Sequence, residues 1–176
     1  MDEKTEAVRR KREDKRRLDG FDRRILSALV VDAGQSYAAL GERVGLSAPA
    51  VHERVRRLKQ TGVLKGTHAR LDGSAVDKPL LAFVHVEAAG WGKSERMMQF
   101  SRFPEVEEMH SVAGAASMIL KVRMQNPQAL EALLAQIHSL TGVTGTRSFI
   151  ALSTYLDRPV QAEVTETWPV VPLPHD

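Results

Sequence analysis

Residues 45–66 read GLSAPAVHERVRRLKQTGVLKG and predict a helix with clear ends. Ser47 can cap its first turn, because the hydroxyl can accept a hydrogen bond from a free backbone amide. Pro49 is tolerated in that turn, where the amides have no intrahelical partner, and Gly62 favours the end of the helix. The buried face is predicted to consist of three apolar residues at helical spacing: Val51, Val55 and Leu58.

Two shorter helices are predicted before this one. Apolar residues at helical spacing indicate a first helix over residues 22–31. Ser36 can cap a second helix that ends near Val44. Gly45 supplies the turn to the third helix, because glycine adopts a positive φ without steric cost. Residues 18–62 are therefore expected to form three helices, the last two as a helix–turn–helix.

The second half of the chain alternates between strand-like and helix-like patterns. Strands are expected over residues 80–88, 105–113, 117–124 and 145–156, and helices over 93–103 and 126–140. The inward-facing helix residues are expected to be Met97, Phe100, Phe103, Leu130, Leu133, Leu134 and Ile137. This order, βαββαβ, is that of a ferredoxin-like antiparallel sheet backed by two helices. The whole chain is thus predicted to be α+β.

The charge is divided unequally between the two halves. The chain has a formal charge of +3, but residues 1–70 carry 17 Lys and Arg against 10 Asp and Glu, and residues 71–176 carry 8 against 12. Such asymmetry indicates that the first half meets a polyanion. Residues 1–17 contain almost nothing apolar and are expected to be a solvated, disordered tail.

Several classes of protein do not fit the sequence. No apolar run approaches the roughly 18 residues of a membrane span, no secretory signal follows the basic N-terminus, and there is no cysteine. A cytoplasmic protein without membrane contact is expected. The six histidines lack metal-ligand spacing, and no nucleophile elbow or phosphate-binding glycine motif occurs. No catalytic residue, metal or cofactor is therefore expected, and Glu108 and His110 are predicted to form only a surface pair.

The outward face of the third helix has side chains that suit DNA. Arg56 could bind guanine through two hydrogen bonds, and Glu53 could accept one from cytosine. The alternative is a solvated face on which Glu53 pairs with Arg56 or Arg57, with His52 merely exposed. Arg54 is expected to reach Asp22 and to be structural. The predicted DNA-binding residues are Ser47, Ala48, Pro49, His52, Glu53 and Arg56, with Arg57, Lys59 and Arg43 contacting phosphates.

Four stretches together resemble the Lrp/AsnC family of transcription regulators. They are LDGFDRRILSAL, ALGERVGLSAPAVHERVRRLKQTGVLKG, FPEVEEMHSVAG followed by ILKV, and LTGVTGTRSFIAL, and the likeness covers about residues 18–156. The resemblance implies a winged helix–turn–helix over residues 18–70, a linker over 71–78 and an effector-sensing, oligomerisation domain over 79–157. Members of the family bind double-stranded DNA as homodimers that often assemble into octamers. They bind small molecules, commonly amino acids, between dimers.

Two positions depart from the family pattern. Gly41 stands where alanine is usual, which permits close approach of another segment. Ser117 stands where the family's hairpin loop usually has an aspartate that suits an ammonium group, so the ligand need not be a free amino acid. The predicted effector-binding residues are Gly114, Ala115, Ala116, Ser117, Thr146 and Ser148. The alternative is a hairpin that needs small residues only in order to turn.

Two further questions remain open at the level of sequence. The three-helix unit predicted over residues 18–62, called the head below, could contact another protein instead of DNA. In that case the chain would be a ligand-sensing or oligomerisation protein. The C-terminal residues 158–176 contain four prolines, which lack the amide that a strand ladder requires. They are expected to be extended or disordered, with Trp168 or Val170 packing on the rest of the chain.

Overall fold

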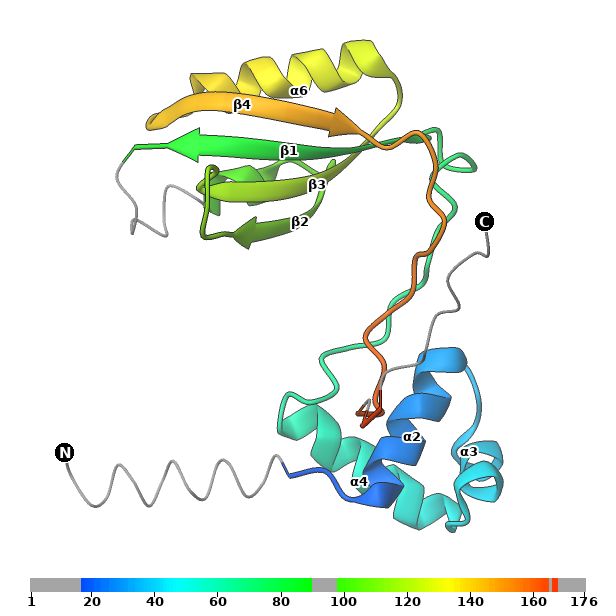
Figure 1. Cartoon of the computed structure of the whole chain (residues 1–176). Coiled ribbons are helices and arrows are strands. Elements are labelled where there is room, and N and C mark those ends of the chain that lie inside the picture. The colour runs from blue at the N-terminus through cyan, green and yellow to red at the C-terminus, as the bar shows by residue number, and fades with distance from the viewer. Residues whose placement is uncertain (1–16, 90–97, 165, 168–176) are drawn as a thin grey trace, which may run out of the picture. The chain divides into compact units, whose positions relative to one another are not determined.

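The computed structural model describes residues 17–89, 98–164 and 166–167, and the chain divides into two compact units. The helical unit comprises residues up to His68 together with those from Asp157 onward. The sheet unit comprises Ala69–Leu156. Figure 1 shows the elements of each unit. Within the described ranges, no helix is long and apolar enough to span a bilayer.

The helical unit contains the three predicted helices, α2 (Gly20–Val31), α3 (Tyr37–Val44) and α4 (Ala48–Gln60). The cap residues are Ser36 for α3 and Ser47 for α4, as predicted, and each accepts a hydrogen bond from the third backbone amide that follows it. Helix α2 begins two residues earlier than predicted because Asp19 caps it. The buried core of the unit consists of Ile25, Leu26, Ala28, Leu40, Val44, Val51, Val55 and Leu58.

A buried carboxylate joins α2 to α4. The side chain of Asp22 has no exposed area, and its Oδ1 accepts a hydrogen bond of 2.8 Å from Nη1 of Arg54. Arg57 donates to both carboxylate oxygens. The predicted structural role of Arg54 is therefore confirmed. A second carboxylate, that of Asp19, also accepts from Arg54 at 2.6 Å.

The segment after α4 differs from the expected wing. Residues 61–79 form turns and irregular chain and contain no strand. Val63 and Leu64 pack against the helical core, whereas residues 65–72 are exposed. A strand requires a hydrogen-bonding partner, and residues 65–72 are instead left on the surface.

The sheet unit has the predicted antiparallel topology, with strands in the order β2-β3-β1-β4. Its elements are β1 (Leu80–Ala88), η1 (Met98–Arg102), β2 (Val106–Ser111), β3 (Met118–Met124), α6 (Pro127–Ser139) and β4 (Val143–Ile150). The helix predicted over residues 93–103 is a short 3-10 helix in its described part. Met97 lies outside the described residues.

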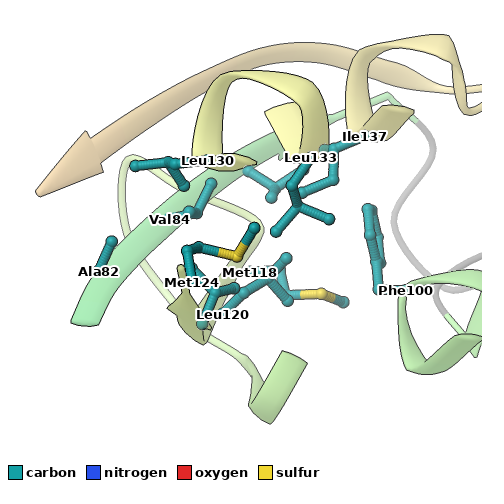
Figure 2. Packing of buried hydrophobic residues seen from close by; sticks show 11 residues of the cluster. Ala82, Val84, Phe100, Met118, Leu120, Met124, Leu130, Leu133 and Ile137 are labelled. Atoms are coloured by element: carbon teal, nitrogen blue, oxygen red, sulfur yellow. The ribbon is translucent and has the colours of Figure 1, made fainter. Parts of the chain in front are cut away.

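One face of the sheet packs against α6 and η1. Figure 2 shows Leu130, Leu133 and Ile137 of α6 and Phe100 of η1 directed at the strands. The strand residues of this core are Ala82, Val84, Val86, Met118, Leu120, Val122 and Met124. Because side chains alternate along a strand, the residues between them lie on the opposite face. That face remains open, with Phe83 39% and Phe149 48% exposed.

Strand β4 ends at Ile150 instead of the predicted residue 156. Ile150 is paired with Ala82, and the amide of Ala151 donates to Leu81. Leu81 is only the second residue of β1. Beyond Ala151, β4 therefore has almost no residues of β1 left to pair with. Leu152 and Tyr155 are consequently 96% and 98% exposed. The segment from Asp157 returns to the helical unit, while Trp168 and Val170 lie outside the described residues.

Replacing the buried carboxylate should destabilise the helical unit severely. We expect Asp22→Asn to lower the free energy of unfolding by about 3 kcal/mol, because the buried carboxylate is removed, Arg57 loses its charge partner and Arg54 keeps only Asp19. Urea unfolding followed by circular dichroism measures the change. Glu42→Gln, an exposed acid-to-amide change on α3, should stay within about 0.5 kcal/mol of wild type. An Asp22→Asn protein as stable as this control would contradict the prediction.

Gly41 has no room for a side chain. A Cβ at this position would lie 2.4 Å from the carbonyl oxygen of Leu46. We therefore expect Gly41→Ala to destabilise the protein by about 1–2 kcal/mol, because the clash exceeds the roughly 1 kcal/mol gain in helix propensity. Gly20→Ala is the matched control, since its Cβ would meet no atom within 4 Å. Equal melting temperatures for the two variants would show that the α3–α4 turn relaxes freely.

Candidate functional site

Helix α4 has a buried face and an exposed polar face. Val51, Val55 and Leu58 are buried, and they hold the helix against α2 and α3. Most of the predicted DNA-binding residues are exposed, namely Ser47, Pro49, His52, Glu53, Arg56 and Lys59, together with Arg43 at the end of α3. Ala48 is half-buried. The structure thus places most of the predicted set on the surface of one helical unit.

Arg56 and Glu53 form a two-point ion pair on this face. Nη2 of Arg56 lies 2.8 Å from Oε1 of Glu53, and Nε lies 3.0 Å from Oε2. The hydrogen bond from Arg56 is the main reason that the pKa of Glu53 is lowered from its usual value. The same pairing raises the pKa of Arg56. Both side chains remain more than half exposed, so the pair is accessible to a ligand.

The other two arginines of α4 are directed toward Asp22. Arg54 binds Asp22 and Asp19, and Arg57 binds Asp22. Burial alone would raise the pKa of Asp19, but the hydrogen bonds from Arg54 and from the Asp22 amide outweigh it and lower that pKa. Arg57 was predicted to contact phosphate, and its guanidinium is already bonded to a buried carboxylate. Lys59 and Arg43 are exposed cations on the same unit.

Tyr37 is a residue of this region that the sequence pattern does not indicate. It is the first residue of α3, and its ring centroid lies 5.4 Å from that of His52 on α4, at an interplanar angle of 59°. Tyr37 also packs against the helical core. The contact gives His52 a neighbour that restricts its orientation. No spacing rule connects the two positions, because they belong to different helices.

The hairpin loop between β2 and β3 holds the first part of the predicted effector region. Gly114 adopts a φ of +146°, which favours glycine. Gly114 and Ala115 are exposed, and Ala116 is 8% exposed. Ser117 is fixed against β1: its amide donates to Val86 at 3.0 Å, and its hydroxyl bonds the amide and the carbonyl of Ala88 at 3.2 and 3.3 Å. The serine thus fastens the loop to the end of β1.

The second part of the region lies on β4, on the other side of β1. Thr146 is paired with Val86 and Ser148 with Val84, and the hydroxyl of Thr146 lies 2.9 Å from Nε2 of His138 on α6. Ser117 and Thr146 therefore both adjoin Val86, from opposite edges of β1. Ser117 and Thr146 thus lie at the same end of β1, whereas Ser148 pairs near the middle of that strand.

A carboxylate at this end of the sheet was not predicted. Glu87 is exposed, and one of its carboxylate oxygens lies 3.2 Å from where a Cβ on Gly145 would be. Glu87 precedes Ala88, to which Ser117 is bonded. Any side chain at residue 145 would crowd the carboxylate. The indicator available in the sequence was a glycine inside a predicted strand, which often marks a close approach.

An ion-pair group lies on the open face of the sheet. Glu108 bonds Lys121 at 2.9 Å and His110 at 3.1 Å, and these bonds, that of Lys121 first, lower the pKa of Glu108. The predicted surface pair of Glu108 and His110 is thus present. Neither here nor elsewhere in the described part of the chain are three His, Asp or Glu side chains grouped as a metal site requires.

Both halves of the chain match models of known domains. Residues 18–59 match the AsnC-type helix-turn-helix domain. Residues 81–161 match the Lrp/AsnC ligand binding domain. The first match covers α2 to α4, and the second covers β1 to β4 and continues past the sheet to residue 161.

Individual relatives agree with this assignment. The HTH-type transcriptional regulator LrpA of Mycobacterium tuberculosis is 39% identical over 143 residues, which cover 80% of this chain and 95% of the relative. The Leucine-responsive regulatory protein of Escherichia coli is 35% identical over 140 residues, 77% of this chain and 85% of the relative. A solved feast or famine regulatory protein from M. tuberculosis, complexed with L-methionine, is 37% identical with a TM-score of 0.75, over 80% and 96% of the two chains. The chain belongs to the Lrp/AsnC family of transcriptional regulators, with an AsnC-type helix–turn–helix and an Lrp/AsnC ligand-binding domain.

Proposed function

We propose that this regulator recognises DNA by inserting α4 into the major groove, and that it does so in the cytoplasm. The observation that carries the proposal is the accessible Arg56–Glu53 pair on the exposed face of α4. A guanidinium can form two hydrogen bonds with guanine, and a carboxylate can accept one from cytosine. The head is basic, as expected of a surface that approaches phosphates.

The ion pair itself need not oppose recognition. Exposed pairs contribute only about 0–1 kcal/mol, so base contacts can replace the bonds between Arg56 and Glu53. Lys59 and Arg43 are exposed and can supply phosphate contacts, which give affinity without sequence information. Arg57 acts mainly by holding α4 to α2 through Asp22. The arginines of α4 thus divide into one that reads bases and two that fix the helix.

The open face of the sheet supports homodimer formation. Phe83 and Phe149 are paired across β1 and β4 and are substantially exposed. The ring centroid of His85 lies 4.9 Å from that of Phe149. An exposed aromatic patch marks an interaction surface, and a two-fold dimer brings the same patch of each subunit together. Such a dimer would present two α4 helices to half-sites about 34 Å apart or multiples of that distance. Assembly of dimers into octamers belongs to the same proposal.

The loop and β4 support binding of a small-molecule effector, an amino acid or a related metabolite. The relative complexed with L-methionine motivates this choice. A carboxylate is the natural charge partner of a bound ammonium group. Ser117 carries no charge, and its hydroxyl is already bonded to Ala88. Glu87 is an exposed carboxylate at the same end of the sheet. We assign the ammonium contact to Glu87 and a fastening role to Ser117.

The proposed recognition of a base by Arg56 can be tested by gel shift with the protein's own promoter region. If Arg56 binds guanine, Arg56→Ala should weaken specific binding by about 1–3 kcal/mol and relax selectivity at one base pair. Lys59→Ala is the control, and it should weaken binding to all sequences alike and reduce the salt slope by about one phosphate contact. If Arg56→Ala instead weakens binding to all DNA sequences equally, Arg56 contacts a phosphate and not a base. Absence of sequence preference at any salt concentration in the wild type would contradict DNA reading and favour a protein partner for the head.

The effector proposal can be tested with a thermal-shift panel of amino acids. A ligand at one hundred times its Kd should stabilise the protein by about 2.7 kcal/mol. Glu87→Gln should abolish the shift, because the ammonium loses its partner, whereas Ser117→Asp should strengthen it by adding a carboxylate. Melting temperatures without ligand separate these effects from changes in intrinsic stability. No shift with any amino acid, in either the wild type or Ser117→Asp, would count against an effector site at this end of the sheet.

A further inference from the structure

The segment that follows β4 is fastened to the helical unit at its far end. Nη1 of Arg23 donates a hydrogen bond of 2.7 Å to the carbonyl oxygen of Ala162. The hydroxyl of Ser27 donates one of 2.6 Å to Oε1 of Glu163. Ala162 also packs against the helical core. Both donors lie on α2, so residues 162 and 163 form an anchor on this helix.

The anchor also forms one wall of a cavity in the helical unit. The cavity has a volume of about 280 Å³, and Gln161 and Glu163 line it together with residues of α2 and of the last turn of α3. The last-turn residues are Arg43 and Val44. The C-terminal segment therefore borders the helix that carries a candidate phosphate contact.

The part of the segment before the anchor has little packing. Leu152, Tyr155 and Val160 are 96%, 98% and 90% exposed. Residues 151–161 connect β4 to the anchor (Figure 1). The anchor holds this strap, residues 151–163, on the helical unit.

We propose that the strap is a releasable second connection between the sensing sheet and the DNA-binding head. The first connection is covalent, through residues 69–79 after α4. The second depends on the anchor, whose few contacts can open without global unfolding. While it is fastened, the head is tied to its own sheet at two points, and its range of movement is restricted. When it opens, only the first connection restricts the head.

The strap can be tested by native-state hydrogen exchange on the full-length protein. Glu163→Ala should speed exchange of the α2 amides about fivefold, the effect of losing one hydrogen bond. Ser27→Ala should do the same even though alanine favours helix more than serine, so the effect cannot come from helix propensity. A chain ending at Leu156 should show the largest increase. Exchange in β1 and β3 should be unchanged in all three variants.

The matched control is Glu166→Ala, which removes the same charge from an exposed position beyond the anchor. It should leave α2 exchange unchanged. The proposal is overturned if α2 exchanges at the wild-type rate in both Glu163→Ala and the shortened chain. It is also overturned if Glu166→Ala matches Glu163→Ala, since the effect would then be one of net charge alone.

A second measurement tests the restriction of movement, and it rests on the proposed DNA function. Inserting half a helical turn of DNA between two half-sites should weaken binding of the wild type at least tenfold. The same insertion should weaken binding of Glu163→Ala less than threefold. Equal losses, together with faster α2 exchange, would show a fastened strap that does not restrict the head, and would overturn the proposal. If the wild type binds no DNA specifically, the proposed function fails, and the exchange measurement still decides whether the strap is fastened.

Discussion

The buried carboxylate of Asp22 is the interaction on which the DNA-binding head depends. It joins α2 to α4 by accepting hydrogen bonds from Arg54 and Arg57. A charge without exposed area is tolerated only where it is paired and hydrogen-bonded, so the rotation of α4 about its axis is restricted by this contact. Once Arg54 and Arg57 face inward, Arg56 faces outward, because successive residues on a helix are separated by 100°.

The sheet unit has a similar division between structure and interaction. The side chains of one face are used for packing, since α6 and Phe100 cover the apolar residues of β1 and β3. The opposite face keeps Phe83 and Phe149 accessible. At one end of the sheet, the same strand β1 holds Ser117 through its backbone and carries Glu87. Glu87 lies four residues after Phe83 on β1 and therefore on the same open face, so the proposed sensing and assembly roles use neighbouring parts of one face of the sheet.

The strap is a second stretch of chain that joins the two units. The helix–turn–helix match ends at residue 59, yet the helical unit also includes residues from Asp157 onward. Strand β4 carries Thr146 and Ser148 and leads directly into the strap. A change at the predicted effector region is therefore linked through the backbone to a contact on α2.

The sequence by itself determined the elements whose signals are local. Ser36, Ser47, Gly45 and the apolar spacing of α4 predicted the helices, since capping and periodicity act within one or two turns. The βαββαβ pattern predicted the antiparallel sheet. Only the tertiary structure decided that Arg57 binds Asp22, that Tyr37 meets His52, that β4 ends at Ile150 where its partner strand runs out, and that residue 163 returns to α2. Each of these depends on residues far apart in the chain, whose proximity is set by packing and not by local preference.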